Sequence, residues 1–334
     1  MLQKKSIPLV RLSLILPFVR ELDRRGLNGN DVLAANGLVR KTVLDSSVFV
    51  PVIVINRFLE DAAKAADDPH LAVGVGKSLD WSTWPPMVEA ASNAKNLVGF
   101  LVRFIRAASA EASSARHELN VQFDFAVFRE KRVAEQEIVP AQNDAFTAAY
   151  TLELMRRAAG PIWDSGQVRL TVSDPDALPK RYMGVHVIGG DEMGITVRFP
   201  SKWLLEPFNR DSFLPSNANV DSPQDLPTQF LDALRHVIVP HLHEAQLGLA
   251  AIAAWAGTSP QALQRKLRAG GTTLTTVIRD LKKDQAIREL LQTDCSIGDI
   301  ASTLGFNNPT SFTRAFKTWT GQSPREYRKN QRNI

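Results

Sequence analysis

The sequence predicts two unlike domains: an α+β domain followed by an all-helical domain with two helix-turn-helix motifs. Strand-like alternation of apolar and polar residues occurs only in the first two-thirds of the 334 residues. A segment rich in proline, serine and asparagine follows at residues 209–228 and has no helical period. Every strong period after it is helical, and there 14 lysines and arginines stand against 8 acidic residues.

The composition is that of a folded protein, with 44% apolar residues, 22% charged residues and a net charge of +5. The charge is uneven, because residues 230–334 carry +6 and residues 1–229 carry −1. Such a basic region favours polyanions as partners. The single cysteine, Cys295, excludes a disulfide scaffold and indicates a reducing, cytoplasmic location. No apolar run reaches the ~18–20 residues of a membrane span, so we expect no membrane partner.

The first domain, placed at residues 1–215, combines helices with strands. Helical spacing, often opened by proline at the first turn, predicts helices over Pro17–Gly26, Pro51–Ala66, Pro69–Leu79, Pro86–Ala108 and Ala141–Gly160. Apolar alternation predicts strands over Leu119–Phe128, Val168–Val172, Val185–Ile188 and Ile195–Phe199. A linker over residues 216–232 then leads to the second domain, residues 233–334.

The second domain opens with a helix-turn-helix pattern. A short alanine-rich helix after Leu249 is followed by a turn at Gly257-Thr258. Ser259 is the expected N-cap of the second helix, and Pro260 takes its first position.

A second unit follows a predicted spacer helix over Thr276–Gln292. Ser296 and Asp299 form a capping box there, Gly305 supplies the turn, and Asn308 with Pro309 opens the second helix. The 17-residue spacer is about 25 Å long, so with the helix widths added the two second helices are separated by about one DNA turn, ~34 Å. One chain could therefore place both in successive major grooves.

Polar and basic residues lie on the outward face of both second helices. A solvated surface is the ordinary explanation of such residues, but their placement on both helices favours contact with double-stranded DNA. The predicted contact residues are Ser259, Gln261, Gln264, Arg265, Arg268, Asn308, Thr310, Ser311, Thr313, Arg314 and Lys317. Phe306, Phe312, Phe316 and Trp319 are expected in the core rather than on a base-stacking surface.

The last third resembles the AraC/XylS family of bacterial transcription regulators. The likeness rests on Ile300, Ala301, Leu304, Gly305 and Phe306, continued by Phe312, Phe316-Lys317, Gly321, Pro324 and Tyr327-Arg328, and covers about residues 245–330. The first domain more loosely resembles the arabinose-binding-like domain of those regulators, chiefly over residues 197–200 with Trp203-Leu204 and at the helical opening Pro17–Gly26. The resemblance implies effector sensing or dimerisation by the first domain. It also implies activation in preference to repression, RNA polymerase as a partner, and a homodimer as one assembly.

The sequence indicates less about the effector than about DNA binding. Trp81 and Trp84 could stack on a planar ligand or close a core, and core packing is the stronger alternative. Lys4, Lys5 and Arg11 could clamp a phosphate or carboxylate, extended by Arg20, Arg24 and Arg25, or form a solvated basic tail. If both groups face one cavity, a cyclic dinucleotide such as c-di-GMP is favoured over a sugar or an amino acid. The domain could instead be an enzyme or a pure dimerisation module.

Other motifs give no support to catalysis, and we expect neither an enzyme nor a bound cofactor. Residues 74–78, GVGKS, resemble part of a phosphate-binding loop, but Leu71 stands where its first glycine is required. His236, His241 and His243 lie near Glu244, yet Pro240 interrupts their helix, so no metal is predicted. Cys295 is expected to be a small packed residue.

Overall fold

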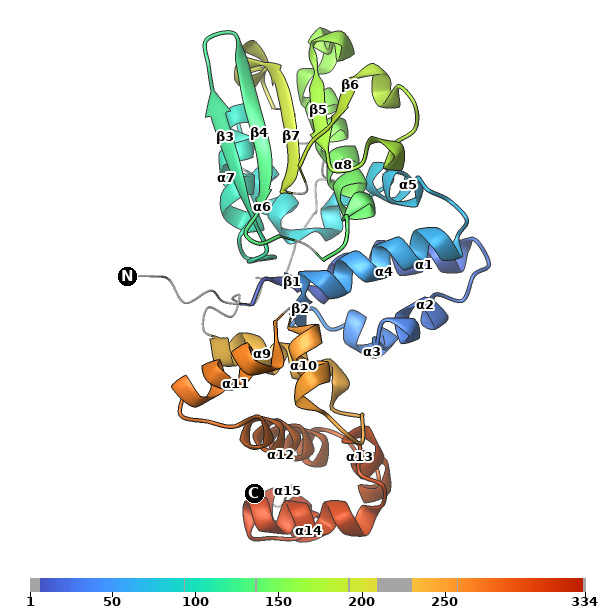
Figure 1. The fold of residues 1–334 in the computed structure, drawn as a ribbon, viewed down its shortest axis with the longest axis vertical. Coiled ribbons are helices and arrows are strands. Elements are labelled where there is room, and N and C mark those ends of the chain that lie inside the picture. Colours follow the sequence, from blue (N-terminus) through green and yellow to red (C-terminus); the bar gives the residue numbers. More distant parts are fainter. Residues whose placement is uncertain are drawn as a thin grey trace. The chain divides into compact units, whose positions relative to one another are not determined.

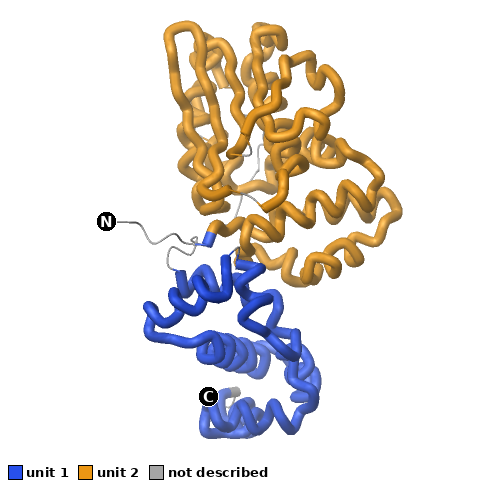
Figure 2. The backbone as a smooth tube through the Cα atoms, viewed as in Figure 1, with its two compact units in different colours: residues 1–7, 227–334 blue, residues 8–226 orange. Residues whose placement is uncertain are grey.

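The computed structural model describes residues 7–92, 94–135, 137–191, 193–208, 230–256 and 258–332. Internal contacts divide the chain into residues 8–226 and a second unit formed by residues 227–334 with residues 1–7 (Figure 2). Most of the predicted linker lies outside the described residues. Its last part, residues 230–232, is not linker, because helix α9 begins at Phe230.

The larger unit begins with helices, as predicted, although their boundaries differ. Its α-helices are α1 (Leu16–Arg24), α2 (Gly29–Ala35), α3 (Arg40–Val43), α4 (Val52–Ala65), α5 (Leu71–Lys77), α6 (Pro85–Ser92), α7 (Leu97–Ala108) and α8 (Ala141–Ala159). The helix expected over residues 86–108 is in fact two helices, because Asn96 accepts a hydrogen bond from the Gly99 N–H and caps a new one. Neither α2 nor α3 was predicted.

Short 3-10 turns connect these elements. They are η1 (Leu12–Ile15), η2 (Trp81–Thr83), η3 (Gly160–Ile162), η4 (Ser165–Gln167), η5 (Pro175–Ala177), η6 (Tyr182–Gly184) and η7 (Ser201–Leu205), with η9 (Val239–His241) in the smaller unit.

Five strands form the main sheet, in the order β3-β4-β7-β5-β6. They are β3 (Ala115–Val121), β4 (Phe125–Arg132), β5 (Arg169–Val172), β6 (His186–Gly189) and β7 (Gly194–Pro200). Only the β5–β6 pair is parallel among these neighbours. A separate antiparallel pair joins β1 (Leu9–Arg11) to β2 (Phe49–Pro51).

The single strand expected over residues 119–128 is a hairpin, so that prediction was wrong. The Gln122 N–H donates to the Phe125 carbonyl across the turn, and the Phe123 side chain is 97% exposed. The alternation continues through the turn by chance, which is why periodicity alone did not reveal it. The three later strands agree with the predicted positions to within a residue.

Helices α7 and α8 cover one face of this sheet (Figure 1). Phe128, Leu170 and Val197 point to that covered face and are at most 1% exposed. Because side chains alternate along a strand, their neighbours in sequence lie on the other face. There Arg198 is half-buried, while Arg169 and His186 are exposed.

The described residues of the smaller unit form helices joined by turns and loops, with no strand among them. Its α-helices are α9 (Phe230–Ile238), α10 (Leu249–Trp255), α11 (Pro260–Ala269), α12 (Leu274–Gln292), α13 (Ile297–Thr303), α14 (Pro309–Thr320) and α15 (Pro324–Arg332). Within this unit α12 lies between α11 and α14 (Figure 1). The predicted spacer and both pairs of helices are confirmed, whereas α15 was not predicted.

Aromatic side chains fill the core of the second helix-turn-helix unit. Phe312 and Phe316 are fully buried against Leu290 of α12, and Phe306 and Trp319 pack on them from the edge. These four aromatics therefore serve the core, as predicted. The turn needs glycine at Gly305, which has φ +68° and whose added Cβ would lie 2.5 Å from a backbone oxygen.

Candidate nucleic-acid interface and ligand cavities

Helix α11 presents one apolar and one polar face. Leu263 and Leu267 are buried, which fixes the rotation of the helix. The Ser259 hydroxyl accepts a hydrogen bond from the Ala262 N–H and caps the helix as expected. The remaining predicted contact residues are all exposed: Gln261, Gln264, Arg265 and Arg268. Gly257, part of the predicted turn, lies outside the described residues.

Helix α14 repeats this arrangement. The Asn308 carboxamide oxygen accepts a 2.8 Å hydrogen bond from the Ser311 N–H, so its side chain is the N-cap. Thr313 differs from the others, because it is half-buried and donates to the Pro309 carbonyl. The other predicted contacts on this helix are exposed: Asn308, Thr310, Ser311, Arg314 and Lys317.

The charges on these two faces are not neutralised locally. Arg265, Arg268, Arg314 and Lys317 form no ion pair with any acidic side chain in the described part of the chain. The Asp299 carboxylate completes the capping box of α13. Exposed cations with no acidic partner among the described residues suit contact with phosphates.

A mostly apolar cavity of about 100 Å³ lies inside the larger unit, lined from β1, α4, α7, α8 and the β3–β4 hairpin. Three of its polar groups are nearly buried. The His117 Nε2 and Glu130 Oε2 atoms are 3.1 Å apart, and Glu111 is 3% exposed. The second carboxylate oxygen of Glu111 has no hydrogen-bond partner among the described residues, and neither has the Trp84 Nε1. Buried polar atoms without partners are costly, so this cavity is a candidate ligand site.

Burial acts on the pKa of both acids at this cavity, Glu111 and Glu130. It raises the pKa of Glu111 above its ordinary value, although the Arg11 guanidinium opposes that effect. At Glu130 burial also acts to raise the pKa, but the hydrogen bond with His117 and nearby positive charge lower it overall.

Of the predicted effector residues that the structure describes, only Trp84 lines this cavity. Trp84 lines it, but Trp81 is buried beneath the Arg157 guanidinium, 4.7 Å from the ring centre. Arg11 is 4% exposed and its Nε donates to Glu111 over 2.9 Å, with further bonds to backbone carbonyls, so it does not form the predicted clamp. Lys4 and Lys5 lie outside the described residues.

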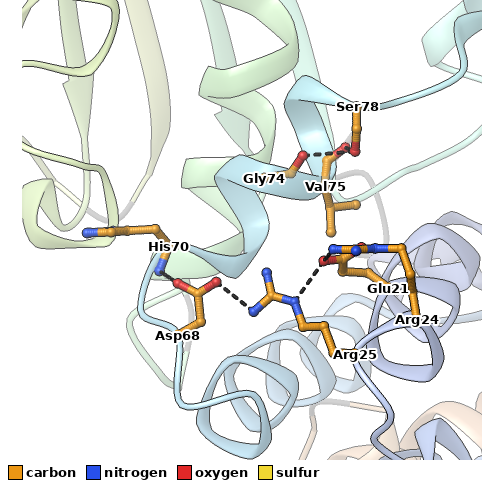
Figure 3. Close-up of polar contacts among 8 residues, drawn as sticks. All are labelled: Glu21, Arg24, Arg25, Asp68, His70, Gly74, Val75 and Ser78. Carbon is orange, nitrogen blue, oxygen red and sulfur yellow. Dashed lines mark hydrogen bonds and ion pairs between the residues drawn. The ribbon is translucent and has the colours of Figure 1, made fainter.

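Two arginines proposed to extend that patch are already paired (Figure 3). Arg24 and Arg25 both donate to the Glu21 carboxylate at 2.7 Å, and Arg25 also reaches Asp68 at 2.8 Å. The hydrogen bonds from Arg24 and Arg25 lower the pKa of Glu21 to about 2. The charges of Arg24 and Arg25 are therefore balanced by Glu21 and Asp68, and these arginines are unsuited to a phosphate clamp.

The remaining motifs have structural explanations. Residues 74–78 belong to helix α5 and its end, where the Ser78 hydroxyl donates to the Gly74 carbonyl (Figure 3). His241 is stacked on Trp255 with ring centres 3.6 Å apart. Within the described ranges no group of three or more metal-binding side chains gathers. Cys295 is exposed, so the prediction of a packed thiol was wrong.

Sequence reasoning missed the acids of the interior cavity. Glu111 lies near the end of a helix and Glu130 in an alternating strand, and neither position carries a recognisable motif. No helix within the described residues is long and apolar enough to cross a membrane.

The fold and this surface define a class, a two-domain protein whose C-terminal unit carries paired helix-turn-helix motifs with basic outer faces. Two family models match: the arabinose-binding domain of AraC transcription regulators over residues 26–208, and a helix-turn-helix domain over residues 252–330. The chain belongs to the AraC family of transcription regulators. It is a DNA-binding regulator with an N-terminal domain of the arabinose-binding type.

Individual relatives agree with this assignment. The chain is 26% identical over 293 residues to the HTH-type transcriptional regulator VirS of Mycobacterium tuberculosis, covering 81% of this chain and 82% of that one. It is 36% identical over 107 residues to the transcriptional activator NphR of Rhodococcus sp, which is 32% of either chain. The crystal structure of the regulator CdpR from Pseudomonas aeruginosa aligns over 95% of this chain and 98% of that one, at 16% identity. The TM-score of that alignment is 0.41.

Proposed function

We propose that this regulator reads an extended DNA site by placing α11 and α14 in successive major grooves. The observation that carries the proposal is the matched pair of exposed faces with unpaired cations, one on each helix. The spacer α12 has 19 residues, a length of about 28 Å at 1.5 Å per residue. With helix widths added, this length suits neighbouring major grooves on one side of a duplex.

The side chains have different expected tasks. Arg265, Arg268, Arg314 and Lys317 would supply salt-dependent affinity through phosphates or, for an arginine, recognition of guanine. Gln261 and the other polar residues near the helix starts would select bases.

Selection of bound genomic DNA fragments with the purified chain tests this proposal and supplies a binding sequence. Against the recovered fragment, Arg265→Ala and Arg314→Ala should each lose about 1–3 kcal/mol of binding free energy. The matched control is Arg288→Ala on α12, whose side chain donates to Gln285 of the same helix. Equal affinities for all three variants and the parent would reject the interface.

We propose further that a small molecule bound in the N-terminal domain controls DNA binding, by favouring one of two states that it binds differently. The cavity with Glu111 and Trp84 supports a compact, mostly apolar effector that donates a hydrogen bond to the free Glu111 oxygen. Pockets for drug-sized ligands span about 300–1,000 Å³, well above the 100 Å³ found here. A cyclic dinucleotide gains no support, because Trp81 and Arg11 do not line the cavity that Trp84 lines.

The effector proposal is tested by filling the cavity. Ala112 lines it and is half-buried, so Ala112→Leu should remove the response to an effector while leaving DNA binding intact. Calorimetric binding of c-di-GMP to the intact chain would contradict the small-effector proposal.

The family supports several further proposals. We propose action by binding rather than by catalysis, in the bacterial cytoplasm where the chromosome lies. Activation with RNA polymerase as partner, and assembly as a homodimer, extend the proposal. Transcription from a reporter promoter by purified RNA polymerase, with and without this protein, tests activation. Analytical ultracentrifugation of the free chain tests assembly as a homodimer.

A further inference from the structure

Three basic residues stand side by side on the face of the sheet that α7 and α8 do not cover. Arg198 of β7 is the register partner of Arg169 of β5, and Arg169 is the register partner of His186 of β6. Neighbouring strands lie about 4.8 Å apart, so these side chains rise from one row across three strands. Like charges placed directly opposite each other destabilise a sheet.

This row has no ion-pair partner in the described part of the chain. Neither arginine nor the histidine forms an ion pair with an acidic side chain within the described ranges, although Asp124 lines the same cavity. Buried arginines of this unit behave differently, since Arg11 pairs with Glu111 and Arg132 with Asp144. What distinguishes Arg169 and Arg198 is that they are register partners, which places two such guanidinium groups on adjacent strands of one face.

The row borders a cavity of about 460 Å³, which is within the usual size range of small-molecule sites, about 300–1,000 Å³. Its lining also includes apolar residues, among them Phe125 and Pro200, which are register partners on the same face as Arg198. The Arg198 guanidinium lies over the Phe125 ring at 4.0 Å, which restrains the arginine before any ligand arrives. None of the residues that line the interior cavity with Glu111 lines this one.

We propose that this cavity binds an organic anion, a carboxylate or a phosphate monoester attached to an apolar, preferably aromatic, body. A guanidinium donates paired hydrogen bonds to either head group, and two guanidinium groups with an imidazole can share its charge. The apolar lining would receive the body of the ligand. The site goes beyond the proposed function, because it depends neither on DNA recognition nor on the interior cavity.

Isothermal titration of the full chain with phenyl phosphate and with benzoate tests this site. Inorganic phosphate probes the head group alone, and benzyl alcohol probes the uncharged body. We expect saturable binding of at least one aromatic anion, weaker binding of inorganic phosphate and none of benzyl alcohol. The tighter of phenyl phosphate and benzoate identifies the head group.

Substitutions of the lining arginines test whether the anion binds in this cavity. Arg169→Gln and Arg198→Gln should each raise the Kd of the aromatic anion about tenfold or more, as expected for a lost charge-assisted contact. Arg198→Lys keeps the charge but loses the paired donors, and should also bind more weakly. Arg116→Gln is the matched control, because Arg116 is exposed on β3 of the same sheet and does not line the cavity.

Thermal unfolding without ligand keeps the test interpretable. Arg169→Gln removes like-charge repulsion, so its melting temperature should equal or exceed that of the parent. The proposal is overturned if neither aromatic anion binds, if benzyl alcohol binds equally well, or if Arg116→Gln weakens binding as much as Arg169→Gln. These outcomes leave the DNA-binding proposal untouched, since no DNA is present.

Discussion

Asn308 allows the capping of α14 to be separated from its contact with DNA. Its carboxamide oxygen accepts the Ser311 N–H at 2.8 Å, while the side chain as a whole remains exposed at the start of the helix. Loss of such a cap costs about 1 kcal/mol, so Asn308→Ala should lower the free energy of unfolding by that amount. Asn308→Asp keeps the acceptor and places a negative charge where the helix dipole favours it, so its stability should match or exceed the parent's.

DNA affinity should follow a different order. If the N-terminus of α14 faces the phosphate backbone, the aspartate meets a phosphate at close range. Two unit charges 4 Å apart repel by about 1 kcal/mol in bulk water and about 4 kcal/mol near a protein surface. Asn308→Asp should therefore raise the Kd at least about fivefold, and the loss should shrink as salt rises.

The two measurements are chemical unfolding and fluorescence anisotropy with the genomic fragment recovered by selection. The expected stability is highest for Asn308→Asp, which equals or exceeds the parent, and lowest for Asn308→Ala. The expected DNA affinity is highest for the parent, lower for Asn308→Ala and lowest for Asn308→Asp. Thr273→Asp is the matched control, because Thr273 caps the spacer α12 through the Thr276 N–H. Unchanged affinity of Asn308→Asp, or an equal loss in the control, would refute the placement of α14 on DNA.

Three further predictions follow from the packing and the charges. Phe316→Ala should destabilise the C-terminal unit by about 3–5 kcal/mol, because the side chain is fully buried among aromatics; chemical unfolding measures this, and a loss under about 1 kcal/mol would contradict it. The hydrogen bonds from Arg24 and Arg25 hold the pKa of Glu21 at about 2, against an ordinary value of 4.5, so its stabilising contribution is present above pH 4.5 and disappears as the pH falls to about 2. Glu21→Gln should therefore flatten the loss of stability over that range, and an unchanged pH profile in acid unfolding would argue against the bridge. Cys295 is exposed, so one thiol per chain should react rapidly with a disulfide reagent under native conditions, and reaction only after unfolding would show a packed thiol.

Local sequence signals predicted the C-terminal unit well because capping residues mark the starts of its helices. Ser259 and Asn308 each precede a proline at a helix start, and both proved to be caps. The N-terminal unit was harder. The break before α7 depends on the capping residue Asn96. The chain turns at Phe123 although the apolar alternation of the sequence continues through that position, so the pattern did not indicate the turn.

The amino-acid sequence was sufficient for the fold class, the family resemblance and the outward faces of α11 and α14, because caps and apolar periods act over a few residues. Only the tertiary structure decided which charges are available for ligands. Arg11 is paired with Glu111, which lies 100 positions away, whereas Arg169 and Arg198 are register partners with no acidic partner among the described residues. Pairing of this kind depends on strand register and helix packing between distant segments, and no local pattern encodes it.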